Sequence, residues 1–133
     1  MTGDRGHPTP RETALSYLEA LNSGDVDRIA ALVGEAFVNE HTSARGTGVV
    51  GRDAYRERLA SFLGTFADLH YEAEETIAEG PLVAVPYVLT ARVSGRPIRI
   101  RGMFRFRIEE GLITHRVDYW DGEEFRRQVE DRG

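Results

Sequence analysis

The 133-residue chain contains no cysteine and only one tryptophan, and it has no long apolar run. Without thiols it cannot form a disulfide framework, a thiolate metal site or a cysteine nucleophile. A membrane-spanning helix needs about 20 apolar residues, and no stretch approaches that length. The first ten residues are polar and include proline, so they do not resemble a secretory signal. We therefore expect a soluble, cytoplasmic protein that does not enter a membrane.

The charge balance is mildly acidic, with 17 basic residues against 22 acidic ones and a formal net charge of −5. That excess disfavours nonspecific nucleic-acid binding as the main role. A chain of this length buries about two-thirds of its unfolded surface, enough for one core. We predict a disordered tail at residues 1–8 and a single domain over residues 9–130.

Apolar residues at helical spacing predict three one-sided helices near the N-terminus. The first follows a capping box formed by Thr9 and Glu12. A second begins after Asp25 and carries apolar residues as far as Val33. A third spans residues 52–66 and has a large aromatic stripe that includes Tyr55 and Phe62, whose residues could also line a pocket.

Strand signals occupy most of the remaining chain. Residues 37–41 predict a short strand, and the glycine-containing stretch 42–51 predicts a mobile loop. Beyond Phe66 the spacing of apolar residues changes from about four to two, so that apolar and polar residues alternate. Strands are predicted over residues 69–77, 82–93, 98–108 and 112–120, followed by a helix from Asp121 to Val129. Helices segregated from an antiparallel meander predict an α+β domain with the helices on one sheet face.

Residues 98–108 alternate most clearly, with apolar residues on one face and arginines on the other. The arginine face also carries Met103, Val117 and Tyr119 from the neighbouring strands. This mixture suits a dimer interface. A solvated surface with cross-strand ion pairs and a nucleic-acid surface are the alternatives, and the net negative charge argues against the second.

Strand parity indicates a polar cluster in the pocket beneath the sheet. Arg116, Asp118 and Trp120 share one face of the last strand, and Asn39 and His41 share one face of the first. An aspartate is disfavoured in mid-strand. Apolar surroundings would raise its pKa, whereas Arg116 or a charged His41 would lower it. A carboxyl in that position can act as a general acid or base.

Structural roles remain open for the same residues. Asp118 could form an ion pair with Arg116, His41 could anchor the adjacent loop, and Asn39 could be a hydrogen-bonding bystander. No glycine-rich phosphate loop follows a strand, the four histidines lack ligand spacing, and no serine lies in a nucleophile elbow. We therefore predict neither a cofactor nor a metal, and favour a cofactor-free acid/base site.

The chain resembles the nuclear-transport-factor-two-like superfamily from about Pro10 to Val129. Within it, the chain resembles the SnoaL-like polyketide cyclase and limonene-epoxide hydrolase branch. The stretches that carry the resemblance are Asn22-Ser23-Gly24-Asp25, Gly51-Arg52-Asp53-Ala54, and Asp118-Tyr119-Trp120-Asp121 leading into Glu124-Phe125. The resemblance implies a cone-shaped α+β fold, in which a curved antiparallel sheet wraps around the N-terminal helices.

Matched to the epoxide hydrolases, Asp118 falls on a carboxylate of their catalytic site. Asn39 and His41 fall where those enzymes hold the attacking water. The arginine and second aspartate expected on the third long strand are replaced here by Tyr87 and Leu89. A hydrolase of this kind would need His41 as a substitute.

The cyclase branch uses a pocket aspartate, often with histidine, for aldol closure without a cofactor, which suits Asp118 and His41. His41, Asn39 or Tyr87 would polarise the carbonyl oxygen of a small hydrophobic substrate. The predicted substrate-binding residues are Asn39, Phe62, Tyr71, Tyr87, Leu89, Ile100, Phe104, Arg116 and Trp120. Two other hypotheses remain: an epoxide hydrolase with a reassembled site, and a non-catalytic binding or dimerisation module.

Overall fold

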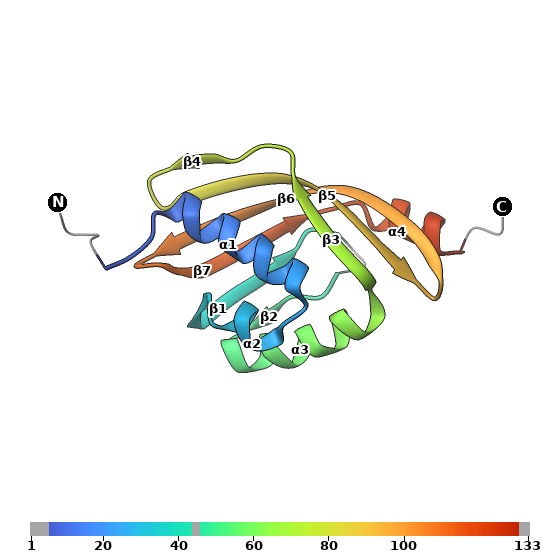
Figure 1. Ribbon diagram of the computed structural model, residues 1–133, viewed down its shortest axis with the longest axis horizontal. Helices are drawn as coiled ribbons and strands as arrows, with labels where there is room; N and C mark the ends of the chain where they lie inside the picture. Colours follow the sequence, from blue (N-terminus) through green and yellow to red (C-terminus); the bar gives the residue numbers. More distant parts are fainter. Residues whose placement is uncertain (1–5, 44–45, 131–133) are drawn as a thin grey trace.

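The structure is a computed structural model that describes residues 6–43 and 46–130. In chain order the elements are α1 (Pro10–Ser23), α2 (Val26–Ala30), β1 (Val33–His41), β2 (Val49–Val50), α3 (Arg52–Thr65), β3 (Ala67–Ala73), β4 (Ile77–Glu79), β5 (Leu82–Val93), β6 (Arg96–Glu109), β7 (Leu112–Tyr119) and α4 (Gly122–Glu130). The strands form one sheet in the order β2-β1-β7-β6-β5-β3, and β4 also pairs with β5. Helices α1, α2 and α3 lie over one face of this sheet, and α4 lies near one end (Figure 1).

The N-terminal helices begin where their capping residues predict. Thr9 and Glu12 make both bonds of the capping box, and α1 ends at Gly24 with φ of 72°. Asp25 caps α2, which is only five residues long. The prediction that this helix reaches Val33 is wrong. The Leu32 carbonyl accepts a hydrogen bond from the Ile113 amide of β7, so the backbone there already belongs to the sheet edge.

The hairpins formed by β5, β6 and β7 match the sequence pattern. The predicted strand over residues 82–93 has the bounds of β5, and glycines with positive φ at Gly95 and Gly111 lie in the two turns. Along β6 one face is buried and carries Ile98, Ile100, Phe104, Phe106 and Ile108, whereas the arginines of the opposite face, Arg99, Arg101, Arg105 and Arg107, are exposed. The alternation therefore identified the covered face of the sheet correctly.

The single strand predicted over residues 69–77 is instead two strands, β3 and β4. Both pair antiparallel with β5, on different parts of its length. The Glu74 amide still donates to the Pro86 carbonyl, but proline has no amide hydrogen to donate back, so the ladder is interrupted at this point. The polar–apolar alternation continues through the break and could not reveal it.

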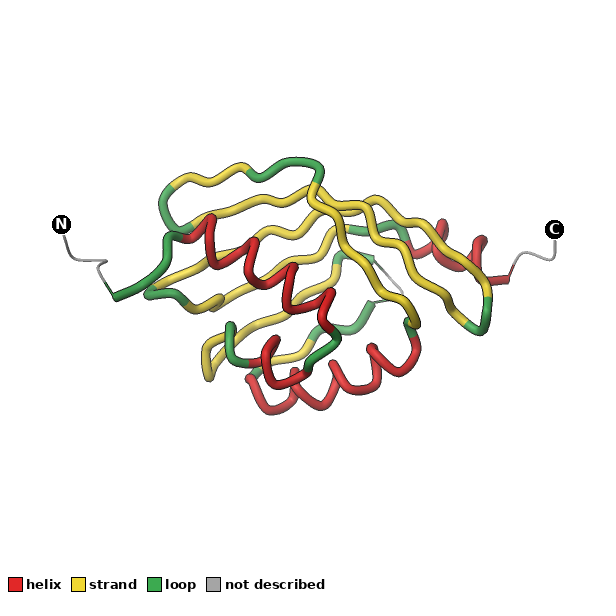
Figure 2. The backbone as a smooth tube through the Cα atoms, in the orientation of Figure 1, coloured by secondary structure: helices red, strands yellow, loops and turns green. Residues whose placement is uncertain are grey.

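The sheet is mixed rather than wholly antiparallel as expected. β1 pairs parallel with β7, with His41 beside Asp118 and Asn39 beside Arg116. Parallel neighbours need a long connection, which residues 42–111 supply. The strands curve around the helices without closing into a barrel (Figure 2). This is the cone-shaped α+β fold that the resemblance implied.

Parts of the predicted tail and loop lie outside the described residues. Residues 1–5 of the tail and residues 44–45 of the loop belong to that group. Within the described part, His7 and Pro8 lie beside Gly111, and the loop contains the short strand β2, which pairs antiparallel with β1. In residues 6–43 and 46–130, no helix is both long and apolar enough to cross a membrane.

The core lies between α1 and the inner faces of β5, β6 and β7. Tyr17 of α1 is fully buried and packs edge-on against Phe104 and Phe106 of β6, at ring-centroid distances of 6.1 and 5.5 Å. The Asn22 side chain donates to the Tyr71 carbonyl at 3.0 Å and accepts from the Tyr71 amide at 2.7 Å. Asn22 thereby ties the end of α1 to β3 and fixes the backbone that carries the Tyr71 ring.

Candidate active site

The parallel register of β1 and β7 assembles the polar cluster. Asn39, Arg116 and Asp118 are 3%, 6% and 5% exposed, and His41 is half-buried. Burial of polar side chains is costly unless hydrogen bonds compensate, so the partners of each group indicate what the site can do.

Asp118 is a buried carboxyl with one firm hydrogen bond. The Tyr87 hydroxyl donates to Oδ1 at 2.6 Å, and Oδ2 lies 3.6 Å from His41 Nδ1. Burial raises the pKa of Asp118 above its ordinary value, and the charge of Arg116 and the Tyr87 hydrogen bond offset only part of that rise. A carboxyl whose pKa is raised by burial is suited to general acid/base chemistry.

His41 is held as a neutral imidazole. The Trp120 indole N–H donates to its Nδ1 at 2.9 Å, which leaves the ring proton on Nε2. Burial, with the charges of Arg116 and Arg58, lowers the pKa of His41 to about 4. The contact between His41 and Asp118 is therefore not an ion pair at neutral pH. The sequence suggested that Arg116 or a charged His41 could lower the pKa of Asp118, and of these two only Arg116 does so.

Gly102 of β6 makes room for the hydrogen bond between Tyr87 and Asp118. Tyr87 and Gly102 face each other across β5 and β6. A Cβ at position 102 would lie 2.5 Å from the Tyr87 hydroxyl oxygen and 2.8 Å from the Tyr119 carbonyl oxygen. Any larger residue at position 102 would displace the Tyr87 phenol or the backbone of Tyr119. The hydrogen bond between Tyr87 and Asp118 therefore requires glycine at this position.

Arg116 is a buried cation without a neighbouring carboxylate. Its Nε donates to Asn39 Oδ1 and its Nη1 to the Tyr17 hydroxyl, both at 2.9 Å, and its Cζ lies 4.8 Å from the Phe104 ring centroid. Within the described part of the chain, no carboxylate lies within 4.0 Å of it. The direct ion pair with Asp118 that the sequence left open is therefore not formed.

The phenols around Arg116 are hydrogen-bonding partners rather than counterions. The hydroxyls of Tyr17 and Tyr55 contact each other, and burial raises the pKa of both. Burial opposes the charge of Arg116, but the nearby Tyr17, Tyr55 and Asp118 hold its pKa above the ordinary value. Arg116 is thus positively charged at neutral pH while both phenols are neutral.

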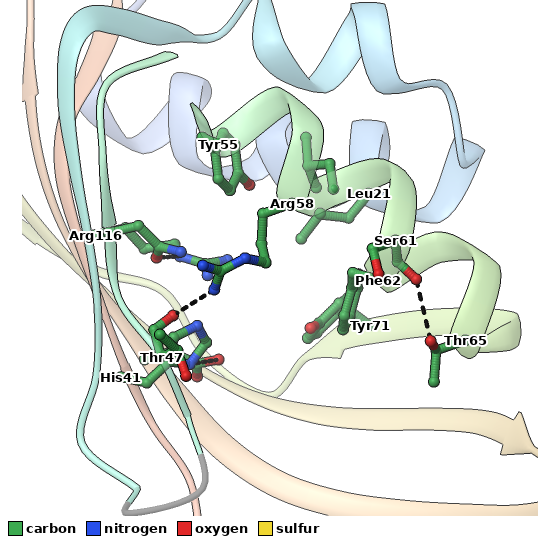
Figure 3. Close-up of a pocket in the computed structure, with 13 residues that line it drawn as sticks. Leu21, His41, Thr47, Tyr55, Arg58, Ser61, Phe62, Thr65, Tyr71 and Arg116 are labelled. Carbon is green, nitrogen blue, oxygen red and sulfur yellow. Dashed lines mark hydrogen bonds and ion pairs between the residues drawn. The ribbon is translucent and has the colours of Figure 1, made fainter. Parts of the chain in front are cut away.

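Two adjoining cavities meet at Asp118. The cavity drawn in Figure 3 has a volume of about 260 Å³, and a second cavity of about 340 Å³ lies next to it. Both have apolar walls, but the first contains more polar side chains and is called the polar cavity, and the second is called the apolar cavity. The residues common to both linings are His41, Phe62, Thr65, Tyr71 and Asp118. The polar side chains found only in the first are Asn39, Thr47, Tyr55, Arg58, Ser61 and Arg116. Because Asp118 belongs to both linings, its carboxyl can act on a molecule that spans them.

The predicted substrate-binding residues divide between these cavities. Phe62 and Tyr71 line both, and Asn39 and Arg116 line the polar cavity. The four that line the apolar cavity alone are Tyr87, Leu89, Ile100 and Trp120.

Phe104 lines neither cavity and is fully buried. Arg116 lies over its ring, and the Tyr87 ring packs against it at 4.6 Å between centroids. These two side chains separate Phe104 from the space in which a ligand could bind. Phe104 can therefore act on the site only through the residues that it supports.

Sequence reasoning missed Arg58 of α3 and the hydroxyl contact that Tyr55 of the same helix makes. Arg58 lines the polar cavity, and its Nη1 donates to the Thr47 carbonyl at 2.8 Å. It lies outside the apolar stripe of its helix, so helical periodicity gave no signal for it. Tyr55 was predicted as a member of that stripe, which the period could identify, but the contact of its hydroxyl with Tyr17 depends on how α1 and α3 pack.

Many solved structures share this fold, and the three that follow are among them. A protein from Catenulispora acidiphila with a ketosteroid isomerase-like fold, in complex with trimethylamine, superposes with a TM-score of 0.82 at 18% identity over 91% of this chain and 93% of that one. A protein from Shewanella denitrificans provisionally described as a SnoaL-like polyketide cyclase gives 0.83 at 19% identity, over 92% and 98%. An epoxide hydrolase from M. tuberculosis, described as LEH-like, gives 0.78 at 19% identity, over 90% and 89%. At these identities the likeness shows the fold alone.

Sequence comparison identifies the family. No curated protein matches the chain. The sequence profile of the SnoaL-like domain matches residues 14–116. This segment includes Asn39, His41 and Arg116 and stops two residues before Asp118. The match covers well over half of the sequence, and the chain therefore belongs to the SnoaL-like domain family.

Proposed function

We propose that this protein is a cofactor-free acid/base enzyme that moves a proton next to the carbonyl group of a small hydrophobic substrate. The reaction is of the polyketide cyclase or isomerase type, with intramolecular aldol closure as the cyclase form. The observation that carries the proposal is the buried Asp118 carboxyl with a raised pKa at the junction of a polar and an apolar cavity. Perturbed carboxyls in clefts are typical of catalytic acids and bases.

In the proposed reaction, Asp118 removes a proton from the carbon next to the substrate carbonyl. The C–H electron pair moves into an enolate, whose oxygen accepts a hydrogen bond from His41 Nε2–H or the Asn39 amide. In a cyclisation the enolate carbon attacks a second carbonyl carbon of the same molecule and forms the new C–C bond. Asp118 then returns its proton to the resulting alkoxide. In an isomerisation the proton returns to a different carbon.

The surroundings of Asp118 suit these steps. Tyr87 already donates to the carboxylate, so we assign it to orienting Asp118 and assign the polarisation of the substrate carbonyl to His41 or Asn39. A neutral His41 can donate from Nε2 without neutralising Asp118. Aromatic walls that hold the two reacting carbons together would supply much of the rate through proximity.

The test is solvent deuterium exchange into ketones. Benzylacetone and alpha-tetralone are incubated with the protein in D₂O, and loss of the protons next to the carbonyl is followed by NMR. We expect exchange above the buffer rate. Asp118→Asn should lower it at least about 100-fold, the usual contribution of a general base. The control is Asp121→Asn, the same chemical change at an exposed helix cap.

Two other functions correspond to other outcomes. An epoxide hydrolase would incorporate labelled solvent oxygen into a diol, without ketone exchange. In the described residues, Asp118 is the only carboxyl that lines either cavity, which disfavours a mechanism with an acid and a base that are both carboxyls. A binding or dimerisation module would bind the ketones without exchange. Either result, or equal exchange by wild type and Asp118→Asn, would contradict the proposal.

The homodimer expected from the sequence remains part of the proposal. The outer sheet face carries the half-buried Met103 and Tyr119 among exposed arginines, and Arg105 lies over the Tyr119 ring. Val117, expected on the same face, is only 5% exposed. Arg101 pairs with Glu74 through two hydrogen bonds of 3.0 Å, so part of this face is also a charged surface with internal ion pairs. Light scattering should give twice the chain mass of 14.9 kDa, and a mass of one chain would contradict the dimer.

A further inference from the structure

The polar cavity contains hydrogen-bond donors that none of the described residues accepts from. Arg116 donates from Nε to Asn39 and from Nη1 to Tyr17, and no described residue accepts a hydrogen bond from its Nη2. Asn39 uses its Oδ1 as an acceptor, and its amide N–H groups likewise have no described partner. In the described residues, the only polar side-chain atom that is both fully buried and without a hydrogen-bond partner is Thr13 Oγ1. The unpartnered nitrogen atoms of Arg116 and Asn39 are therefore not fully buried. The free donors of Arg116 and Asn39 therefore keep access to the cavity that both residues line.

The charge of this cavity is positive although the chain as a whole is acidic. Its ionisable lining consists of Arg58, Arg116, the neutral His41, two neutral phenols and Asp118. Two guanidinium groups thus face a single carboxyl. Figure 3 shows Arg58 extending from α3 across the cavity toward Thr47, with Arg116 on the opposite wall. A concave site lined by charge of one sign attracts ligands of the opposite sign.

A buried guanidinium with no adjacent counterion destabilises the folded protein, because its lost hydration is not compensated. Asp118 is the nearest candidate on the same strand, but it contacts Tyr87 and His41 instead of Arg116. The neutral phenol of Tyr17 accepts a hydrogen bond from Arg116 without supplying charge, and the neutral phenol of Tyr55 contacts Tyr17. Guanidinium groups recognise carboxylates through paired hydrogen bonds, so a ligand carboxylate would complete the arrangement.

From these observations we infer that the substrate is an apolar carboxylic acid whose carboxylate binds Arg116 and Asn39 in the polar cavity. Its apolar part lies in the adjoining cavity lined by Leu89, Ile100 and Trp120. The reacting carbon then lies between them, at Asp118. Arg58 adds a second positive charge on the facing wall. This inference deepens the proposed function, because it concerns the substrate of the same site.

The test compares an acid with its neutral amide, which has almost the same shape. Phenylbutyrate and phenylbutyramide are titrated separately, and the fluorescence of Trp120, the single tryptophan, reports binding in the apolar cavity. Hydrogen bonds to charged groups are worth about 10- to 100-fold in affinity, so we expect at least about tenfold tighter binding of the acid. Equal affinities in the wild-type protein would overturn the inference without any variant.

Three substitutions locate the preference. Arg116→Gln should bind acid and amide equally, whereas Arg116→Lys should keep part of the preference. The matched control is Arg101→Gln, which removes an exposed arginine from the outer sheet face and should keep the full preference. A preference that survives Arg116→Gln would overturn the assignment to Arg116. Should that variant not fold, Asn39→Leu must reduce the preference, and an unchanged ratio would contradict the inference.

Asp118→Asn separates this inference from the proposed function. It removes the carboxylate nearest the ligand and should strengthen acid binding while it abolishes deuterium exchange. Because the inferred substrate carries a carboxylate, the exchange assay is repeated with 3-benzoylpropionate, an apolar keto acid. An acid preference without exchange into the ketones or this keto acid in wild type would support the binding assignment and refute the enzymatic one. Ketone exchange without an acid preference would do the reverse.

Discussion

The arginines on the two faces of β6 and β7 differ in burial and in whether a carboxylate lies beside them. On the outer face, Arg101 and Arg107 are exposed, and each lies within 3.3 Å of a carboxylate oxygen, of Glu74 and Glu109 respectively. On the inner face, Arg116 is buried among rings and an amide, with no carboxylate within 4.0 Å in the described residues. Among the described residues, carboxylates thus accompany arginines whose charge water already screens, and none accompanies the buried Arg116.

This difference separates the roles of the two sets. Exposed ion pairs contribute little to stability, so the outer pairs shape a surface. The inner cluster leaves Arg116 without a counterion and Asp118 with a raised pKa, and both conditions oppose folding. Groups retained at such a cost are expected at functional sites. The following predictions test whether the inner cluster differs from the outer face in this way.

The largest expected effect on stability comes from His41 in acid. Its pKa is about 4 in the folded protein against 6.5 ordinarily, so between these values the unfolded chain binds a proton that the folded chain does not. Stability should fall as the pH drops from 6.5 to about 4, by roughly 3 kcal/mol at 1.36 kcal/mol per pH unit. Urea denaturation of wild type and His41→Gln across this range measures the loss. Parallel curves for the two proteins would contradict the neutral, buried imidazole.

A smaller effect is expected from Tyr87→Phe. The Tyr87 hydrogen bond lowers the pKa of Asp118, so its loss should raise that pKa and reduce the fraction of ionised base at a given pH. The acid limb of kcat/KM should move to higher pH by about one to two units, since hydrogen bonds to charged groups are worth about 1.5–3 kcal/mol. Tyr71→Phe is the control, because Tyr71 lines the cavities without a hydrogen bond to Asp118. A shift of equal size in both variants would refute the specific role of Tyr87.

Asp118→Asn should leave stability unchanged or raise it. Because the folded pKa is raised, the ionised carboxylate is less favourable in the folded protein than in the unfolded chain. Stability is therefore lost as the pH rises through the folded pKa. An asparagine avoids that loss and can still accept from Tyr87. Thermal denaturation at pH 7 should give an equal or higher midpoint, and a clearly lower midpoint would indicate that the carboxylate holds the fold together.

The smallest effect is expected from Arg101→Gln on the outer face. Its partner Glu74 remains solvated when the arginine is removed, so no buried charge is left behind. Denaturation and deuterium exchange should both match wild type. A marked loss of either would mean that the outer face contributes to the site or to the fold more than its exposure indicates.

Most of the sheet could be predicted from local pattern, and the reasons for the failures are physical. The alternation of apolar and polar residues identified β5 and the buried face of β6. It could do so because successive side chains along a strand point to opposite faces of the sheet. The break between β3 and β4 depends on Pro86 in another strand. The end of α2 depends on a bond from Ile113. Such contacts between distant segments leave no trace in local periodicity.

The candidate site was predictable to a similar extent. Parity brought Asn39, His41, Arg116 and Asp118 to one face, but it could not say that Arg116 would turn to Asn39 and Tyr17 instead of Asp118. Side-chain torsions and helix packing decide that choice. Arg58 could not be found at all, because its long side chain reaches the cavity from a position that helical spacing places in solvent.

The most direct test of the account is the pKa of the Asp118 carboxyl itself. Carboxyl ¹³C NMR of the folded protein across pH resolves this group, and the resonance missing from Asp118→Asn identifies it. We predict titration above the ordinary value of 3.8. Titration at or below 3.8 would mean that the carboxylate is stabilised as a structural ion, and it would contradict its proposed role as the acid/base group.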